Sequence, residues 1–152
     1  MLTLNCIRTT SENQDFRLLV KELDTYLKIT DGDEHSFYAQ YNKIDLIRHT
    51  VVAYQNGVAV GCGAFKPFSE STVEVKRMYV PPALRGKGIA SVVLRELESW
   101  AAEEGYLKCV LETGKRMPEA IGLYQKNGYA SIPNFGQYIG VDNSVCFEKV
   151  IR

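Results

Sequence analysis

The sequence predicts an α/β (α+β) fold, in which a twisted mixed β-sheet of about seven strands is flanked by about four helices. Strand-like and helix-like segments alternate along the chain in the order βααβββαβαββ. The 152 residues are 45% hydrophobic, which is enough for one core of ordinary composition. Because no linker, repeat or low-complexity tract divides the chain, we expect a single domain over residues 1–152.

The first third of the chain predicts a strand followed by two helices. Residues 2–8 alternate between apolar and polar side chains, which is typical of a strand. Ser11-Glu-Asn-Gln14 matches a capping box and predicts the start of a helix. Apolar residues then recur at helical spacing: Phe16, Leu19, Val20, Leu23 and Leu27. After a turn at 31–33, a second, shorter helix is predicted by Phe37, Tyr38, Tyr41 and Ile44.

The middle of the chain predicts three strands. Residues 49–55 and 58–65 flank Asn56-Gly57, a pair that favours the type I′ hairpin turn because both central residues of that turn need a positive φ. Gly61 and Gly63 inside the second strand indicate a bulge or a close approach of neighbouring groups. Residues 72–80 form a long β-branched run and predict the third strand.

The last part predicts two helices and three strands. Pro81-Pro82 ends the preceding strand, and residues 89–102 have helical periodicity with Gly105 as the stop. A short strand over 108–112 precedes a helix that begins near Pro118 and closes at Asn127-Gly128. The tail predicts two strands around a long loop, the last over Val145–Val150.

Composition excludes several classes of protein. The formal net charge is zero, which argues against a general nucleic-acid binder and against a polybasic membrane anchor. The chain starts without a signal peptide and has no apolar run near the ~20 residues needed to span a bilayer, so we expect a cytoplasmic protein. No Cys or His spacing matches a metal site. Four separated cysteines are expected to be buried thiols: Cys6, Cys62, Cys109 and Cys146.

The most informative segment is the turn that opens the long helix. Arg85-Gly-Lys-Gly-Ile-Ala90 places backbone N–H groups at a helix N-terminus, which is a ready site for an anion. A Walker A loop is excluded because Pro81 occupies its first glycine position, and a dinucleotide fingerprint is excluded because Ser91 replaces its last glycine. Taken alone, the turn is equally compatible with a tight connection that carries exposed cations.

The surrounding residues resemble the GNAT N-acetyltransferases. Arg85, Gly88 and Ala90 match motif A of that family, Gln/Arg-x-x-Gly-x-Gly/Ala, after a strand that ends in Met-Tyr-Val. Residues 120–129, Ala-Ile-Gly-Leu-Tyr-Gln-Lys-Asn-Gly-Tyr, are similar to motif B. The resemblance covers nearly the whole chain, most closely residues 74–129, and identifies residues 1–152 as one N-acetyltransferase domain.

The resemblance implies acetyl-CoA as co-substrate, without a metal. The backbone of Met78 and Val80, with Tyr79 between them, would pair with the pantetheine arm, and Asn127 or Lys126 would contact the coenzyme. Tyr124 would lie near the thioester sulfur. Backbone N–H groups would bind the pyrophosphate along one run of residues: Arg85, Gly86, Lys87, Gly88, Ile89 and Ala90.

Acetyl transfer to a primary amine needs a neutral nucleophile and a proton for the departing thiolate. Tyr124 can supply that proton, and Glu74, on the strand before motif A, is the candidate base. The alternatives are a tyrosine in the core and a carboxylate paired with a neighbouring cation. No cysteine is placed as a nucleophile, so we expect direct transfer. A non-catalytic acyl-CoA-binding sensor module is the alternative function.

The acceptor site is predicted in the polar and aromatic loop over residues 132–144. Tyr138 and Asn134 are the candidate substrate-binding residues, and the alternative is a plain glycine-rich connector. Phe37, Tyr38 and Tyr41 are candidates for the opposite wall. The acceptor is a small-molecule amine or a protein amine. The resemblance implies a homodimer as a common assembly, although the sequence does not show one.

Overall fold

The computed structural model describes residues 3–31 and 46–152. The strands are β1 (Asn5–Thr9), β2 (His49–Gln55), β3 (Val58–Pro67), β4 (Thr72–Tyr79), β5 (Lys108–Gly114), β6 (Ala130–Ile132) and β7 (Ser144–Val150). The helices are α1 (Gln14–Asp31), α3 (Ile89–Glu103) and α4 (Pro118–Lys126), with short 3-10 helices η2 (Pro82–Leu84) and η3 (Gly136–Tyr138). The predicted helix around Phe37 to Ile44 lies outside the described residues.

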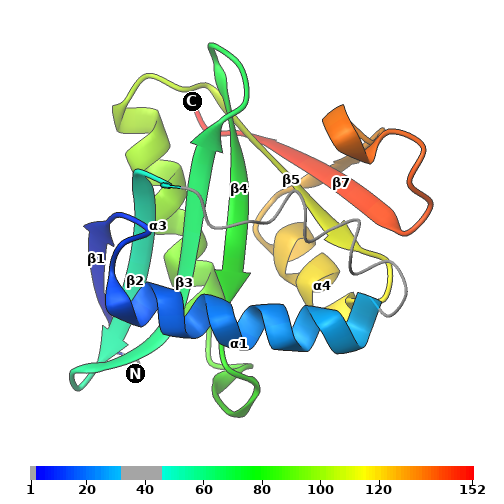
Figure 1. Cartoon of the computed structure of the whole chain (residues 1–152). Coiled ribbons are helices and arrows are strands. Elements are labelled where there is room, and N and C mark those ends of the chain that lie inside the picture. Colours follow the sequence, from blue (N-terminus) through cyan, green and yellow to red (C-terminus); the bar gives the residue numbers. More distant parts are fainter. Residues whose placement is uncertain (1–2, 32–45) are drawn as a thin grey trace.

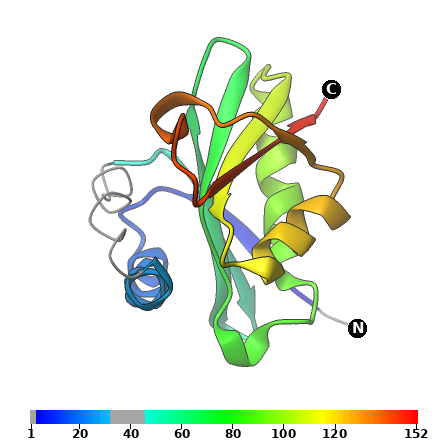
Figure 2. The same cartoon turned by 90° about the vertical axis from the view of Figure 1, so that its right-hand side faces the viewer.

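The fold is a seven-stranded mixed sheet with helices on both faces, as the sequence predicts. The strand order is β1-β2-β3-β4-β5-β7-β6, and β4 and β5 are the one parallel pair among the described strands. Helix α1 covers one face, while α3 and α4 cover the other (Figures 1 and 2). The loop that carries η3 folds over the same face as α1 (Figure 2).

Each face of the sheet has its own apolar core. On the α1 face, Phe16, Leu19, Val20 and Leu23 pack against Val52, Cys62, Ala64 and Tyr79. On the other face, α3 contributes Ile89, Val93, Leu94 and Leu97. Fully burying each such side chain stabilises the fold by about 1.5–3 kcal/mol. The two cores hold the middle strands firmly between the helical layers.

The start of α1 differs from the expected capping box. The N–H of Phe16 donates to Asn13 Oδ1 at 2.9 Å, so Asn13 caps the helix. Ser11 has another role: its Oγ accepts a hydrogen bond from the N–H of Ile47 at 2.8 Å, in a buried position. The capping-box prediction at Ser11 was wrong because the spacing of a local motif does not reveal that a distant buried amide needs the same oxygen.

The predicted hairpin and the predicted irregularity in β3 are both confirmed. Asn56 and Gly57 have φ of 53° and 80°, as a type I′ turn requires. A Cβ atom at Gly63 would lie 2.5 Å from the Met78 sulfur and 2.9 Å from Leu97, so only glycine fits there. Opposite Gly63, β4 carries two residues, Arg77 and Met78, between the paired positions Lys76 and Tyr79, which makes a β-bulge.

Candidate functional site

The candidate site lies where the parallel strands β4 and β5 separate. They pair from Thr72↔Lys108 to Glu74↔Val110, and beyond this point β4 runs on to Tyr79 and β5 to Gly114 without pairing with each other. Figure 1 shows the two strands diverging. Because the sheet is open here, main-chain groups of β4 and side chains from both faces of the sheet can reach a ligand. Two cavities flank this opening.

The larger cavity, called the coenzyme cavity below, has a volume of about 310 Å³. It lies between the end of β4, the first turn of α3 and helix α4. Its walls include these residues from the predicted coenzyme site: Met78, Tyr79, Val80, Arg85, Gly86, Gly88, Ile89 and Ala90. The structure therefore brings most of the two matched motifs together around one space.

The first turn of α3 is built to bind an anion. Gly88 is the N-cap residue with φ of 85°, and no side chain caps the helix. The first N–H groups of the helix therefore have no partner within it, and the helix dipole favours a negative charge beside them. A Cβ atom at Gly86 or Gly88 would meet nothing within 4 Å, so the space above the turn is open. These features fit the pyrophosphate of coenzyme A.

Two predicted coenzyme residues have structural contacts as well. Arg85 Nε donates to the carbonyl of Val80 at 2.9 Å, and its guanidinium lies 5.1 Å from the centre of the Tyr26 ring, which holds this cation at the cavity wall. Asn127 Nδ2 donates to Ser91 Oγ at 3.0 Å and thereby ties α4 to the first turn of α3. Asn127 and Lys87 do not line the cavity, so coenzyme contact by either residue stays a prediction.

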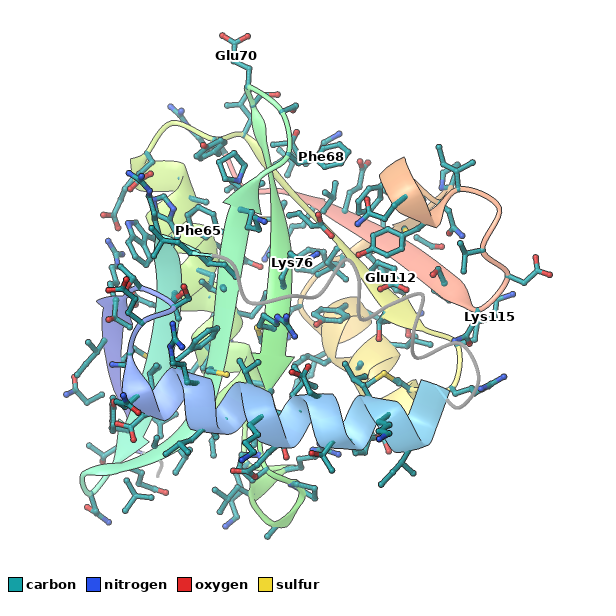
Figure 3. The ribbon with its side chains drawn as sticks, in the orientation of Figure 1. Phe65, Phe68, Glu70, Lys76, Glu112 and Lys115 are labelled. Atoms are coloured by element: carbon teal, nitrogen blue, oxygen red, sulfur yellow. The ribbon has the colours of Figure 1, made fainter. Side chains whose placement is uncertain are left out.

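The second cavity, called the polar cavity below, has a volume of about 110 Å³ and lies on the α1 side of the sheet. It is lined by charged side chains from β4 and β5, namely Glu74, Lys76, Arg77 and Glu112, and also by Leu23, Leu27, Met117 and Tyr138. Figure 3 shows Lys76 and Glu112 on the sheet face that α1 crosses. A small cavity with this many charges is suited to a polar ligand or to the reactive end of one.

Glu74 and Tyr138, predicted for different roles, meet in the polar cavity. The Tyr138 hydroxyl donates to Glu74 Oε2 at 3.3 Å, and Lys76 Nζ lies 3.5 Å from the same oxygen. Tyr138 is 3% exposed, so it is a wall residue and not a surface residue of the loop. Its pKa is raised, first by burial and then by the negative charge of Glu74, and the phenol therefore stays protonated at neutral pH.

Asn134 lies in the same loop, but its described contacts are internal to it. Its Nδ2 donates to the carbonyls of Tyr138 and Val141, both at 3.0 Å. It therefore holds the loop in the shape that presents Tyr138. A direct contact between Asn134 and the acceptor stays a prediction. The other candidate wall, Phe37, Tyr38 and Tyr41, lies outside the described residues.

Tyr124 lies at the junction of the two cavities and lines both of them. Its ring is buried and packs on Tyr129 and Phe147, with centroid distances of 5.8 and 6.2 Å. The pKa of its phenol is raised, mainly by burial and further by the charge of Glu112. Tyr124 therefore keeps its proton at neutral pH and is a potential hydrogen-bond donor at this junction.

Three charged residues of the polar cavity were not assigned to the site from the sequence: Lys76, Arg77 and Glu112. Glu112 projects from β5 and accepts a hydrogen bond from Ser144 Oγ at 2.7 Å. It could have been found from the alternation of β5, where Cys109 and Leu111 are core residues and position 112 belongs to the other face. Arg77 could not have been found in this way, because the bulge in β4 changes the face on which it lies.

Over residues 3–31 and 46–152, no group of three or more His, Cys, Asp and Glu side chains could hold a metal ion. In the same part of the chain, no helix is both long and apolar enough to cross a membrane.

Comparisons with known proteins agree with this geometry. The model of the acetyltransferase (GNAT) family matches residues 16–129. An IAA acetyltransferase from Azospirillum brasilense is 38% identical over 139 residues, covering 86% of this chain and 87% of its own. A Klebsiella pneumoniae structure assigned to the acyl-CoA N-acyltransferases aligns with a TM-score of 0.83 and 27% identity over 99% of both chains. The PaiA N-acetyltransferase of Thermoplasma acidophilum, solved with coenzyme A, aligns at 0.70 and 19% identity over 98% of this chain and 99% of its own.

We expect Gly88→Asp to weaken acetyl-CoA binding by about tenfold or more, because it places a carboxylate where the pyrophosphate would meet the helix N-terminus. Gly105→Asp is the matched control. Gly105 follows the other end of the same helix, has φ of 95° and is likewise open, so it shares the backbone strain of Gly88. Calorimetric titration of both folded variants checks this prediction. Equal acetyl-CoA affinity in the two variants would contradict it.

Proposed function

Because this chain belongs to the GNAT acetyltransferase family, we propose that it transfers the acetyl group of acetyl-CoA directly to a primary amine held in the polar cavity. The enzyme class, an acetyl-CoA-dependent N-acetyltransferase, follows from the family, while the amine acceptor and the direct transfer are our proposal. The observation that supports it is the position of Tyr124, which lines both the coenzyme cavity and the polar cavity. A side chain that contacts both cavities can interact with the acetyl-CoA and with the amine.

Acetyl-CoA supplies an activated acetyl thioester, and the coenzyme cavity fits it. We assign the pyrophosphate to the first turn of α3, where Gly86 and Gly88 leave the backbone accessible. Arg85 and Lys126 add positive charge at the cavity wall. The edge of β4 that faces β5, over Met78 and Tyr79, has no strand partner and offers backbone groups for the pantetheine arm. Binding through main-chain groups leaves the side chains of the polar cavity for the acceptor.

Glu74 is the candidate base. An amine is mostly protonated at neutral pH, so its proton must leave before or during attack. Both described contacts of the Glu74 carboxylate, from Tyr138 and Lys76, are made to Oε2. Its other oxygen is therefore available to accept the acceptor's proton, directly or through one water. Tyr138 and Lys76 then hold the carboxylate in a fixed orientation.

Tyr124 is the candidate donor to the departing sulfur. Because its pKa is raised by burial, the phenol is protonated at neutral pH and is a hydrogen-bond donor. A thiolate that develops at the junction of the cavities would accept a hydrogen bond from this hydroxyl. We therefore assign Tyr124 to stabilise the leaving group.

Direct transfer is favoured over a covalent cysteine route. No cysteine lines either cavity in the described residues. Burial raises the pKa of Cys62 and of Cys109 to about 12 and that of Cys146 to about 11, so these thiols are not nucleophilic thiolates at neutral pH. An acyl-enzyme on cysteine would need a thiol that is both reactive and accessible.

The function is tested by measuring release of free thiol from acetyl-CoA with a panel of primary amines, together with mass analysis of the products. We expect amine-dependent thiol release and N-acetylated products with at least one class of amine. A purified protein that binds acetyl-CoA yet releases no thiol with any amine would instead support the sensor alternative.

We expect Tyr124→Phe to lower kcat on the order of 10²-fold while the acetyl-CoA Kd changes little, because the ring is kept and only the proton donor is lost. Tyr106→Phe, which removes a hydroxyl from a tyrosine that lines neither cavity, is the control and should keep full kcat. Steady-state kinetics and calorimetry measure the two quantities. A Tyr124→Phe enzyme with wild-type kcat would mean that water protonates the thiolate.

We expect Glu74→Gln to lose most of its rate near pH 7 and to recover part of it near pH 10, where free amine is abundant. Glu112→Gln is the comparison, because it removes the other carboxylate of the cavity while keeping its shape. The measurement is kcat/KM for the amine as a function of pH. If Glu112→Gln shows the pH-dependent loss and Glu74→Gln does not, the base is Glu112.

A further inference from the structure

Arg77 is an unusual residue at the edge of the polar cavity. It is one of two described non-glycine residues with positive φ, at 60°, and it forms the bulge of β4. Its side chain is only 2% exposed. Residues held in sparsely populated backbone conformations concentrate at functional sites, where the surrounding structure enforces them. A buried guanidinium in such a position calls for an explanation.

The described contacts of Arg77 use only one part of its guanidinium. Nη1 donates to Asp24 Oδ1 on α1 at 3.0 Å. Nε and Nη2 are buried and have no hydrogen-bond partner among the described residues. These two nitrogens lie on one edge of the guanidinium, and their N–H groups point in the same direction, which is the fork that binds a carboxylate through two parallel hydrogen bonds.

The bond to Asp24 links Arg77 to α1, but it does not account for the two unpaired donors. Buried N–H groups without partners are rare, and each one destabilises the fold. Burial lowers the pKa of Arg77, although an arginine side chain remains charged in a protein. Nε and Nη2 therefore offer two donors to a second anionic group, in addition to the carboxylate of Asp24 that pairs with Nη1.

Arg77 faces the polar cavity and not the coenzyme cavity. It lines the former beside Glu74, Lys76, Glu112 and Tyr138, and it is absent from the walls of the latter. Given the proposed function, we propose that the acceptor is a small amine that also carries a carboxylate, as an amino acid does, and that Arg77 Nε and Nη2 bind this carboxylate. The amine end then lies toward Glu74 and the acetyl group.

The size and charge of the cavity fit this class of acceptor. Its volume of about 110 Å³ is below the ~300–1,000 Å³ of pockets for drug-sized ligands. The carboxylates of Glu74 and Glu112 suit an amine, while the Arg77 fork suits a carboxylate. A molecule with both groups on a short skeleton satisfies both requirements at once.

The first experiment compares matched acceptors that differ only in a carboxylate: alanine with ethylamine, and serine with 2-aminoethanol. We expect wild type to favour the amino acids in kcat/KM. Arg77→Gln should lower kcat/KM for the amino acids by about 10- to 100-fold and that for the simple amines by less than about threefold. The quantity compared between wild type and Arg77→Gln is the ratio of kcat/KM for the amino acid to kcat/KM for the simple amine. Because each amine has the same basicity in both assays, the difference in basicity cancels.

Two variants separate recognition from folding. Asp24→Asn breaks the same ion pair with α1 but keeps the fork, so it should lower the melting temperature as Arg77→Gln does and still favour amino acids. Arg77→Lys keeps a charge without the fork and should restore the preference only in part. Equal losses for both classes of acceptor in Arg77→Gln, or a wild type that favours simple amines, would overturn the proposal.

A second measurement does not depend on catalysis or on a folded variant. Propionate has the carboxylate but no amine, and we expect it to bind coenzyme A-loaded wild type in a calorimetric titration and to compete with the acceptor. Undetectable propionate binding would overturn the carboxylate site even if amines are acetylated. Conversely, propionate binding without any amine acetylation would support the carboxylate site while the proposed function fails.

A carboxylate could also belong to the acyl group of the donor. Malonyl-CoA in place of acetyl-CoA tests this source. We expect no preference for malonyl-CoA, because Arg77 does not line the coenzyme cavity. If wild type prefers malonyl-CoA and Arg77→Gln loses this preference, Arg77 binds the acyl group of the donor. That result would overturn the assignment of Arg77 to the acceptor.

Discussion

The β-bulge at Arg77 and Met78 is the constraint on which the site depends. In β4, Val73 and Val75 belong to the α3-face core, so a regular strand would direct position 77 to that core as well. The extra residue reverses the alternation: Met78 packs on the α3 side beside Gly63, and Arg77 reaches Asp24 on the α1 side. A regular β4 would bury an arginine among aliphatic side chains, at a large cost in free energy.

The same strand separates two kinds of recognition. Beyond Glu74 it has no neighbour on the β5 side, so its main chain is open toward the coenzyme, while its polar side chains face the other cavity. Main-chain groups and helix ends can bind the coenzyme wherever the backbone has the correct shape, and this binding depends little on which side chains are present. The acceptor, by contrast, meets charged side chains. Acceptor choice can therefore change through a few side chains on β4, β5 and the loop of η3, while coenzyme binding is kept.

The sequence predicted those parts of the fold whose cause is local. The Asn56-Gly57 turn, Pro118 at the first position of α4 and the open first turn of α3 each follow from the backbone preferences of the residues concerned. Features that depend on distant partners were not predictable. Ser11 fitted a capping box, but the buried N–H of Ile47 determines its role. Arg77 was not assigned to the site, because the bulge that reverses its face depends on Gly63 in the adjacent strand.

The charges on the walls of the polar cavity also favour an acceptor with two opposite charges. The described walls carry two carboxylates, Glu74 and Glu112, and two cations, Lys76 and Arg77, so the formal charges of these four side chains cancel. Asp24, which pairs with Arg77, lies outside the walls. A simple ammonium would add an unbalanced charge to a small, largely buried space, which costs free energy unless a carboxylate is neutralised by it. A zwitterion adds none and pairs each of its ends with an opposite charge. The amine then becomes reactive by losing a proton to a carboxylate that Tyr138 already orients, while the Arg77 fork holds the other end in place.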